Sequence, residues 1–499
     1  MKRLICLVTL LAAALSALAA DADSLRIGSK RFTESYILAQ VLAQTAAPQL
    51  AVPPEVKQGL GNTAIVYEAL RSGSIDLYPE YAGTIALEIL KSPRPMDLAA
   101  MNTALAPLGL GAAVNLGFND GYALAMRAAD ADRLGVRTLS DMAKHPELKL
   151  GLSNEFIGRA DGWKGLAAAY RLPQSPTGLD HGLAYDAIAA KQVDAIDIYT
   201  TDAKIGHLGL HVLQDDKAYF PRYDALILYR LDVPQRLPTA WAALQGLEGR
   251  INEDAMIAMN ARAELQGVAF DVIARDFLAG KQAQGGGRGY WAKLFAPDLG
   301  RLALQHVGLV VASVLAAALI AIPLAIWSFP HPRARAVLLG FTGLLQTVPS
   351  LALLAILISL MGAIGIVPAL VALTLYALLP IMRNTVTGLG EVSQGLREAA
   401  TALGMTPKQR MRFVELPLAM PTVLAGVRTA TTIAIGTATI AAFIGAGGFG
   451  ERIVTGLALN DNGLLLAGAI PAAVLALVSE AIFGLISHFP TPLRDNRIG

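Results

Sequence analysis

The sequence predicts two kinds of domain in one chain, an exported two-lobed α/β domain followed by an all-α domain of five transmembrane helices. Three observations predict this: an apolar leader, a long stretch of ordinary globular composition, and five apolar runs after residue 300. Of the 41 basic and 39 acidic residues, only 19 lie in residues 301–499. The net charge of +2 provides no field that would attract nucleic acid, so we expect no such partner.

The first twenty residues have the layout of a secretory signal peptide. Lys2-Arg3 is followed by an apolar run and by Ala17-Leu18-Ala19, a small-residue cleavage signal, before polar sequence begins at Asp21. We therefore expect residues 1–20 to be a signal peptide and the domain that follows to be exported. An uncleaved signal anchor is the alternative, and it would leave this domain on the same side of the membrane.

From Ser24 onward, short strand-like runs alternate with helical patterns. The expected elements are a strand at 25–27, a helix at 33–46 capped by Thr33, a strand at 55–57, a helix at 63–72, and a strand at 75–78 closed by Pro79. This alternation favours a mostly parallel sheet with helices on both faces, whose ligands bind in the loops after the strands. Residues 24–284 are long for one such sheet, which favours two lobes.

Tyrosines are concentrated in this exported part, since twelve of the thirteen precede residue 300. Several follow strand-like runs, and aromatic faces grouped around a cleft attract a cation that cannot donate hydrogen bonds. These tyrosines are Tyr81, Tyr122, Tyr199 and Tyr223. Lys30 and Arg159 can hold an anionic end of the same ligand. Alternatively, the tyrosines are half-buried packing residues and the basic side chains are solvated.

Three segments resemble the substrate-binding proteins of the osmoprotectant ABC importer family, which takes up glycine betaine, choline, carnitine and related trimethylammonium compounds. They are GSKRFTESYIL at 28–38, GLGNTAIV at 59–66 and DLYPEYAGT at 76–84. The resemblance implies a periplasmic-binding-protein-like fold in which Tyr81, Tyr122, Tyr199 and Tyr223 form a cage and Lys30, Thr84 and Arg159 make polar contacts. This chain has Asn119-Asp120-Gly121-Tyr122 where the family usually has Asn-Asn-Thr-Tyr, a departure that bears on the exact substrate.

Five apolar runs after residue 300 have close to, or more than, the length that a helix needs to cross a bilayer. They lie at about 303–329, 337–361, 364–382, 421–445 and 463–487. Basic residues gather in the first and third loops and in the tail, which predicts that these segments and the C-terminus are cytoplasmic. We expect a linker at 285–302, a transmembrane domain at 303–490, and a binding domain on the outer side of the plasma or inner membrane. Arg428 and Glu480 are expected to pair, because lone charges inside a membrane are costly.

The third loop, 398–417, carries a motif similar to the EAA loop of type I ABC import permeases. Its residues are Glu398, Ala399, Ala400 and Gly404, followed by Val414-Glu415-Leu416-Pro417. A short helix, a turn at Gly404 and a second helix that starts at Thr406-Pro407 can dock on a nucleotide-binding subunit. The resemblance therefore implies ATPase coupling through Glu398, Ala399, Ala400 and Gly404. An ordinary basic loop between two spans is the alternative.

The chain lacks a phosphate-binding Gly-x-x-x-x-Gly-Lys-Ser/Thr motif, so we expect ATP hydrolysis in separate ATPase subunits and no enzyme activity, cofactor or metal in this chain. Residues 445–450 fit the Gly-x-Gly-x-x-Gly pattern but end a membrane span, which argues against nucleotide binding.

The predicted function is that of a fused substrate-binding and permease subunit of an ABC importer for quaternary-ammonium osmoprotectants. The permease would act as a homodimer or with a second permease. One alternative is an importer of another zwitterion, such as ergothioneine or an amino acid. The other is a membrane ligand sensor, which would need an output domain inside the cell.

Overall fold

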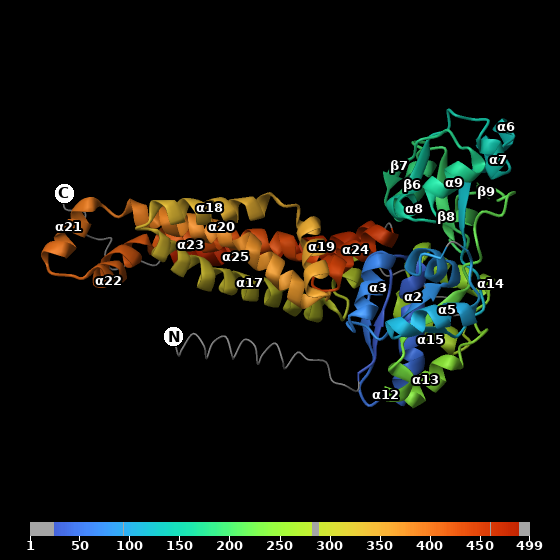
Figure 1. Ribbon diagram of the computed structural model, residues 1–499, viewed down its shortest axis with the longest axis horizontal. Coiled ribbons are helices and arrows are strands. Elements are labelled where there is room, and N and C mark those ends of the chain that lie inside the picture. The colour runs from blue at the N-terminus through green and yellow to red at the C-terminus, as the bar shows by residue number, and fades with distance from the viewer. Residues whose placement is uncertain (1–23, 93, 282–288, 460, 489–499) are drawn as a thin grey trace. The chain divides into compact units, whose positions relative to one another are not determined.

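The computed structural model describes residues 24–92, 94–281, 289–459 and 461–488 (Figure 1). The chain divides into two compact units, Met1–Gly287 and Arg288–Gly499. The predicted signal peptide at 1–20 and the first residues of the predicted linker, 285–288, lie outside the described residues.

The first unit contains two five-stranded sheets, one in each lobe, so the predicted two-lobed α/β fold is confirmed. The first sheet has the order β2-β1-β3-β10-β4, with β1 (Arg26–Gly28), β2 (Glu55–Lys57), β3 (Leu77–Tyr81), β4 (Leu110–Ala113) and β10 (Ala225–Arg230). The second has the order β7-β6-β8-β5-β9, with β5 (Tyr122–Arg127), β6 (Leu150–Ser153), β7 (Thr177–Leu179), β8 (Ala195–Tyr199) and β9 (Leu210–Val212).

Each sheet is mostly parallel, as predicted, because four of its five strands run in the same direction and one runs against them. β10 runs antiparallel to β3 and β4, and β5 runs antiparallel to β8 and β9. β5 and β10 each follow a crossing between the lobes. The chain leaves the first lobe after β4 and enters β5, and it returns to the first lobe after β9 and enters β10. The two crossing segments lie side by side, joined by a bridge between Asn119 and Asp224. The lobes are therefore connected by a two-stranded hinge.

Helices cover the first sheet, and the largest is α2 (Thr33–Ala46), whose Leu38 and Leu42 belong to one core with Ile27 of β1. The other main helices of this lobe are α3 (Thr63–Arg71), α5 (Leu98–Leu105), α13 (Pro238–Gln245), α14 (Glu253–Glu264) and α15 (Phe270–Leu278).

Two local predictions in this lobe are wrong. Thr33 is the first residue of α2 and not its cap, because Phe32 occupies the N-cap position and no side chain caps the helix. β3 continues through Pro79 to Tyr81. Proline lacks a backbone N–H group and cannot donate to a neighbouring strand. On the β1 side of β3, pairing occurs only between Ile27 and Leu77, and β1 ends at Gly28, so no strand on that side needs a hydrogen bond from Pro79.

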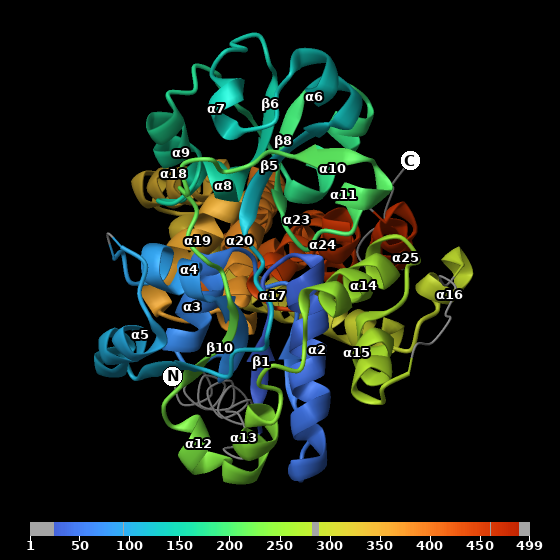
Figure 2. The ribbon, with the colours of Figure 1, turned by 90° about the vertical axis from the view of Figure 1, so that its right-hand side faces the viewer.

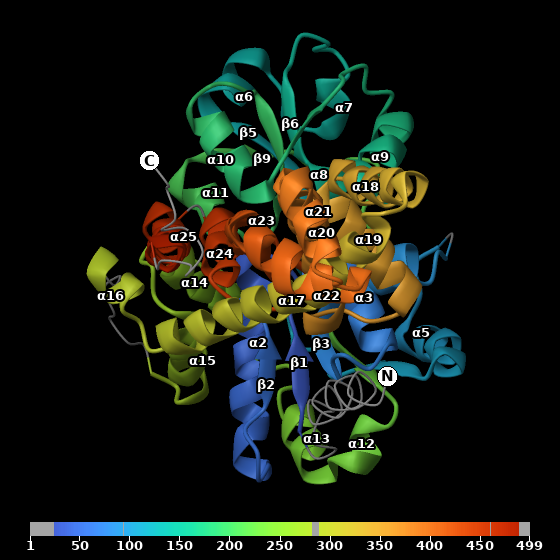
Figure 3. The ribbon, with the colours of Figure 1, turned by 90° about the vertical axis from the view of Figure 1, so that its left-hand side faces the viewer.

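The second lobe shows the alternation expected of a sheet covered on both faces. Leu124 and Met126 of β5 pack in one core with Trp163 of α9 (Trp163–Tyr170), whereas Ala123 and Ala125 face a second core. That second core contains α10 (His181–Ala189), which lies on the opposite side of the strands from α9 (Figures 2 and 3). Shorter helices of this lobe are α6 (Ala128–Leu134), α7 (Leu139–Met142), α8 (Asn154–Gly158) and α11 (Lys204–His207).

The second unit is helical. Its elements are α16 (Tyr290–Leu294), α17 (Leu299–Ser328), α18 (Pro332–Thr347), α19 (Ser350–Met361), α20 (Ile366–Glu391), α21 (Gln394–Ala402), α22 (Pro407–Arg410), η4 (Met411–Glu415), α23 (Leu416–Ala438), η5 (Ile440–Ile444), α24 (Gly450–Leu459) and α25 (Asn462–His488). Among the described residues, four helical stretches are long and apolar enough to cross a membrane, and α18 with α19 makes up to a fifth. The predicted helical membrane domain is confirmed.

The boundaries of the spans differ from the prediction. The second apolar run is broken between α18 and α19, which are bent by 102° at Val348-Pro349. Val348 has an extended backbone, as residues before proline usually do, so the sequence contained this signal. The first span begins at Leu299, inside the predicted linker, and α23 ends at Ala438, before the expected end of its run at 445. The predicted pairing is confirmed, because Arg428 donates from Nε to Glu480.

Candidate functional site

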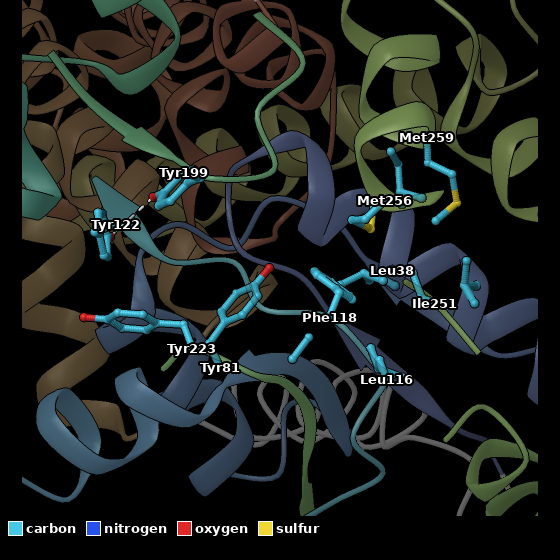
Figure 4. Close-up of a cluster of buried hydrophobic side chains, with 14 of the residues drawn as sticks. Leu38, Tyr81, Leu116, Phe118, Tyr122, Tyr199, Tyr223, Ile251, Met256 and Met259 are labelled. Carbon is cyan, nitrogen blue, oxygen red and sulfur yellow. Dashed lines mark hydrogen bonds between the residues drawn. The ribbon is translucent and has the colours of Figure 1, made fainter. Parts of the chain in front are cut away.

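The four predicted tyrosines gather between the lobes at the ends of strands (Figure 4). Tyr81 is the last residue of β3, and Tyr223 lies two residues before β10. Tyr122 begins β5 directly opposite Tyr199, the last residue of β8, and the antiparallel register brings their ring centroids to 5.1 Å. Tyr223 meets the Tyr122 ring edge-on at 5.8 Å. Strand register thus produces the cluster that the sequence pattern suggested.

Phe32 completes this cluster, although the sequence analysis did not name it as a site residue. Its ring centroid lies 5.1 Å from that of Tyr199 in the second lobe and 6.2 Å from that of Tyr81 in the first. The signal in the sequence was its place in the loop between the first strand and α2, where ligands of α/β folds bind. We call Phe32, Tyr81, Tyr122, Tyr199 and Tyr223 the aromatic cluster.

Two basic side chains face this cluster, and each is paired with a carboxylate. Lys30 Nζ lies 4.8 Å from the Tyr81 ring centroid and donates to Glu80 Oε1 at 2.6 Å. The Arg159 guanidinium lies 5.0 Å from the Tyr122 ring centroid and forms a bidentate pair with Asp161, both contacts at 2.7 Å. Burial raises the pKa of Asp161, but the pair with Arg159 outweighs it and holds that pKa below its usual value.

Thr84, the seventh predicted residue, joins the lobes. Its Oγ1 accepts a hydrogen bond of 3.1 Å from Arg159, which comes from the other lobe. The structure therefore brings all seven predicted residues to one place, and each is less than a tenth exposed. Tyr223 OH also donates to Asp161 at 2.7 Å. The phenols stay neutral, because burial raises the pKa of each tyrosine of the cluster well above its usual range.

Other contacts between the lobes show that the first unit is closed. Thr201 of the second lobe donates to Glu34 of α2 at 2.5 Å, and Thr63 of α3 donates to Glu155 of α8 at 3.2 Å. Asn260 of α14 donates to the Thr201 carbonyl at 3.1 Å. These bonds cross between elements of different sheets, so they form only when the lobes meet.

Glu34 is a second functional candidate that the sequence analysis missed. Tyr81 OH donates to its Oε1 at 2.6 Å, which attaches it to the aromatic cluster. Burial raises the pKa of Glu34 to about 7, although hydrogen bonds from Thr201, Tyr81 and Asn260 oppose the shift. Asp120, the residue that departs from the family pattern, is also buried, and its pKa is raised well above its usual value by burial and by Glu34. In the sequence, Glu34 looked only like an acidic residue in the first turn of a helix.

Metal binding finds no support at this site. Among the residues that the structure describes, no group of His, Cys, Asp and Glu side chains is arranged to hold a metal ion.

The predicted coupling loop forms two short helices at one end of the helical bundle, opposite the end that holds α19 and α24 (Figure 1). Glu398, Ala399 and Ala400 lie in α21, and Gly404 follows with a left-handed backbone, φ +78°. Thr406 caps α22 in a capping box with Gln409. Arg410 donates to buried Glu415 at 2.6 Å and to Thr401 of α21 at 3.2 Å, and the second of these bonds joins the two helices.

Comparison with protein families matches each unit to one model. Residues 23–280 match the substrate-binding domain of ABC-type glycine betaine transport systems. This match covers more than half of the chain. The chain belongs to this family. Residues 313–489 match the inner-membrane component of binding-protein-dependent transport systems. One chain of the glycine betaine transport family thus joins the binding component and the permease component of an ABC importer.

Several relatives resemble one or both parts. An ergothioneine transport permease and binding protein from Helicobacter pylori is 33% identical over 271 residues, which cover 52% of this chain and 48% of that protein. The match therefore spans about half the length of that relative. A carnitine transport permease from Listeria monocytogenes is 40% identical over 39% of this chain and 86% of its own length. A choline transport system permease from Bacillus subtilis is 40% identical over 39% of this chain and 89% of its own length.

Solved structures are similar to parts of this chain. A glycine betaine/carnitine/choline ABC transporter structure has a TM-score of 0.44 and 26% sequence identity, and the match covers 51% of this chain and 98% of that chain.

Proposed function

We propose that the aromatic cluster captures a small trimethylammonium solute, of the glycine betaine, choline or carnitine type, and that the permease part of the same chain takes it across the membrane. The observation that carries this proposal is the meeting of five aromatic rings from both lobes, with centroids 5.1–6.2 Å apart. A quaternary ammonium offers no hydrogen-bond donor, so ring faces are the groups best suited to bind it.

The charges around the cluster support a cationic group in the ligand. Lys30 and Arg159 lie over the faces of Tyr81 and Tyr122, which indicates that rings of this cluster attract a positive charge. Their charges are balanced by Glu80 and Asp161. Glu34 and Asp120, by contrast, have no ion pair with any described cation. The site therefore has more acidic than basic groups, which favours a ligand that brings a positive charge.

We propose further that separate ATPase subunits bind the coupling loop, whose end of the bundle faces the cytoplasm. Large apolar side chains are exposed there: Leu403 is 80% exposed and Phe413 is 59% exposed. Apolar side chains in an otherwise basic loop mark a surface that another protein covers. The basic residues Arg397, Lys408, Arg410 and Arg412 at this end agree with a cytoplasmic position. Two copies of the permease part, or one with a second permease, would enclose the path, and the binding domain would work on the outer side.

A ligand panel tests this function. The full chain in lipid nanodiscs is titrated calorimetrically with glycine betaine, choline, carnitine, ergothioneine and methionine. We expect binding of at least one compound that carries a trimethylammonium group and none of methionine. Tight binding of methionine, which has no quaternary nitrogen, together with no binding of the other four, would exclude the proposed ligand class.

Ergothioneine is the second candidate, favoured by the Helicobacter pylori relative, an ergothioneine transport permease and binding protein whose match covers 52% of this chain. It also carries a trimethylammonium group, so the aromatic cluster can accept it in the same way. Selective binding of ergothioneine over the three osmoprotectants would assign the chain to that substrate.

A further inference from the structure

Two carboxyl groups and one hydroxyl group meet where the lobes close. Thr201 Oγ1, from the segment after β8, lies 2.5 Å from Glu34 Oε2 of α2. The same oxygen lies 2.9 Å from Asp120 Oδ1, in the first crossing segment of the hinge. All three side chains are less than 5% exposed. We call Glu34, Thr201 and Asp120 the carboxyl triad.

The number of hydrogens available determines the state of this triad. A threonine hydroxyl group carries one hydrogen and donates to one acceptor. Both contacts can be hydrogen bonds only if one carboxyl group is protonated and donates to Thr201 Oγ1. The neighbouring donors do not change this count, because Tyr81 OH donates to Glu34 Oε1 and Asn260 Nδ2 donates to Glu34 Oε2.

We infer that the carboxyl triad binds one proton when the lobes close, so that capture of a ligand takes up this proton from solvent. The ligand part of this inference rests on the proposed function. The proton site itself depends only on closure of the lobes.

The charges that face the triad favour the protonated state. Burial is the main cause that raises the pKa of both Glu34 and Asp120. The negative charge of Asp202 raises both values further. Burial lowers the pKa of His181, but Asp202 outweighs burial and raises it to about 9, so protonated His181 offsets part of the Asp202 charge and burial remains the main cause of the shifts in Glu34 and Asp120. The other titratable or charged groups around the triad are Tyr81 on β3, Lys30 beside Tyr81, Lys204 on α11 and Glu264 on α14. Burial raises the pKa of Glu264 to about 7, so this carboxyl group is neutral below that pH and adds a negative charge only above it.

The pH dependence of closure follows from the change in environment of the two carboxyl groups when the lobes open. Glu34 belongs to the first lobe and Thr201 to the second, so opening separates them and returns the carboxyl groups to water, where their pKa is about 4. Closure raises that pKa to about 7 for Glu34. The proton therefore stabilises the closed form fully below about pH 4, and this stabilisation is lost as the pH rises through about 7. In this window the Kd for ligand rises by at most about tenfold per pH unit, and it levels off above the window.

Calorimetry measures this proton uptake. The full chain in maltoside micelles is titrated with glycine betaine at about pH 6 in two buffers of different ionisation enthalpy. We expect uptake of about one proton per ligand, because neither group of glycine betaine titrates near this pH. Asp120→Asn and Glu34→Gln should each abolish the uptake, since either leaves one ionised carboxylate that accepts from Thr201. Asp132→Asn, which removes an exposed carboxylate paired with Arg137, should leave it unchanged.

Infrared difference spectra of the ligand-bound chain give an independent measure. The C=O stretch of a protonated carboxylic acid should be present in the wild type at about pH 6 and absent from Asp120→Asn and Glu34→Gln. No proton uptake and no such band, with ligand bound, would overturn the inference. If glycine betaine does not bind, the titration is repeated with the compound of the panel that binds best. If none of the trimethylammonium compounds binds, the proposed ligand class fails, and the band is then measured with the lobes held closed by a short thiol crosslinker between Thr63→Cys and Glu155→Cys. A missing band in that crosslinked form also overturns the inference.

Discussion

Replacing Tyr199 by leucine is expected to weaken ligand binding by about thirtyfold or more. Its ring contacts Phe32 and Tyr122, both at 5.1 Å between centroids, so it stands at the junction of the two lobes. A desolvated cation–π contact is worth about 2 kcal/mol, which corresponds to about thirtyfold in Kd. Leucine fills similar apolar space but offers no negative ring face. The measurement is the Kd of the full chain for the compound of the panel that binds best.

Two control variants separate loss of the ring from loss of stability. Tyr199→Phe keeps the aromatic face and removes only the hydroxyl group, whose contact with Tyr122 OH is long at 3.5 Å. We expect it to bind nearly as tightly as the wild type. Tyr229→Leu removes a tyrosine that packs on Trp241, away from the site, and should leave Kd unchanged. Equal affinities of Tyr199→Leu and Tyr199→Phe would show that the ring face does not bind the ligand.

Replacing Gly404 by valine is expected to abolish the ligand-stimulated part of ATP hydrolysis and to leave ligand affinity unchanged. Gly404 has φ +78°, a backbone conformation that costs a β-branched residue about 1–3 kcal/mol. The Cβ atom of a side chain at this position would meet no atom within 4 Å, so we attribute the effect to the backbone. The strain changes the angle between α21 and α22, the surface that we propose binds the ATPase. The rate is measured on the full chain reconstituted with its ATPase subunits, with and without ligand.

Gly340→Val is the matched control for this experiment. Gly340 lies in α18 and has ordinary helical backbone geometry, and the Cβ atom of a new side chain there would also meet no atom within 4 Å. This variant should keep stimulated hydrolysis near the wild-type rate. If Gly404→Val retains full stimulation, the turn does not transmit coupling.

Much of the aromatic cluster could be predicted from the sequence, because its tyrosines stand at strand ends and parallel strands bring those ends together. The register that sets Tyr122 opposite Tyr199 could not be predicted, since it depends on β5 running antiparallel after the lobe crossing. Phe32 was predicted only as part of a loop after a strand, where ligands were expected, and not as a member of the cluster. Glu34 was missed, because it looked like an ordinary acidic residue at the start of a helix. Only closure of the second lobe places Tyr199 and Thr201 against these two residues.

The helix boundaries of the membrane domain could not be predicted from the sequence either. Hydropathy identified the apolar stretches, but it carries no information on how a helix ends. The break at Val348-Pro349 and the end of α23 at Ala438 depend on local backbone geometry and on packing between helices. Proline at 349 was the one local signal for the break. The pair of Arg428 and Glu480 was predictable, because the cost of a lone charge in a membrane leaves few other partners.

The most direct test of a cation held by ring faces compares choline with 3,3-dimethyl-1-butanol, which has the same shape but a carbon atom in place of the charged nitrogen. Both are titrated into the full chain in lipid nanodiscs, and the Kd values are compared. The account predicts that the neutral compound binds at least about thirtyfold more weakly, because it loses the attraction to the rings and to the acidic site. Equal affinity for the two compounds would contradict it.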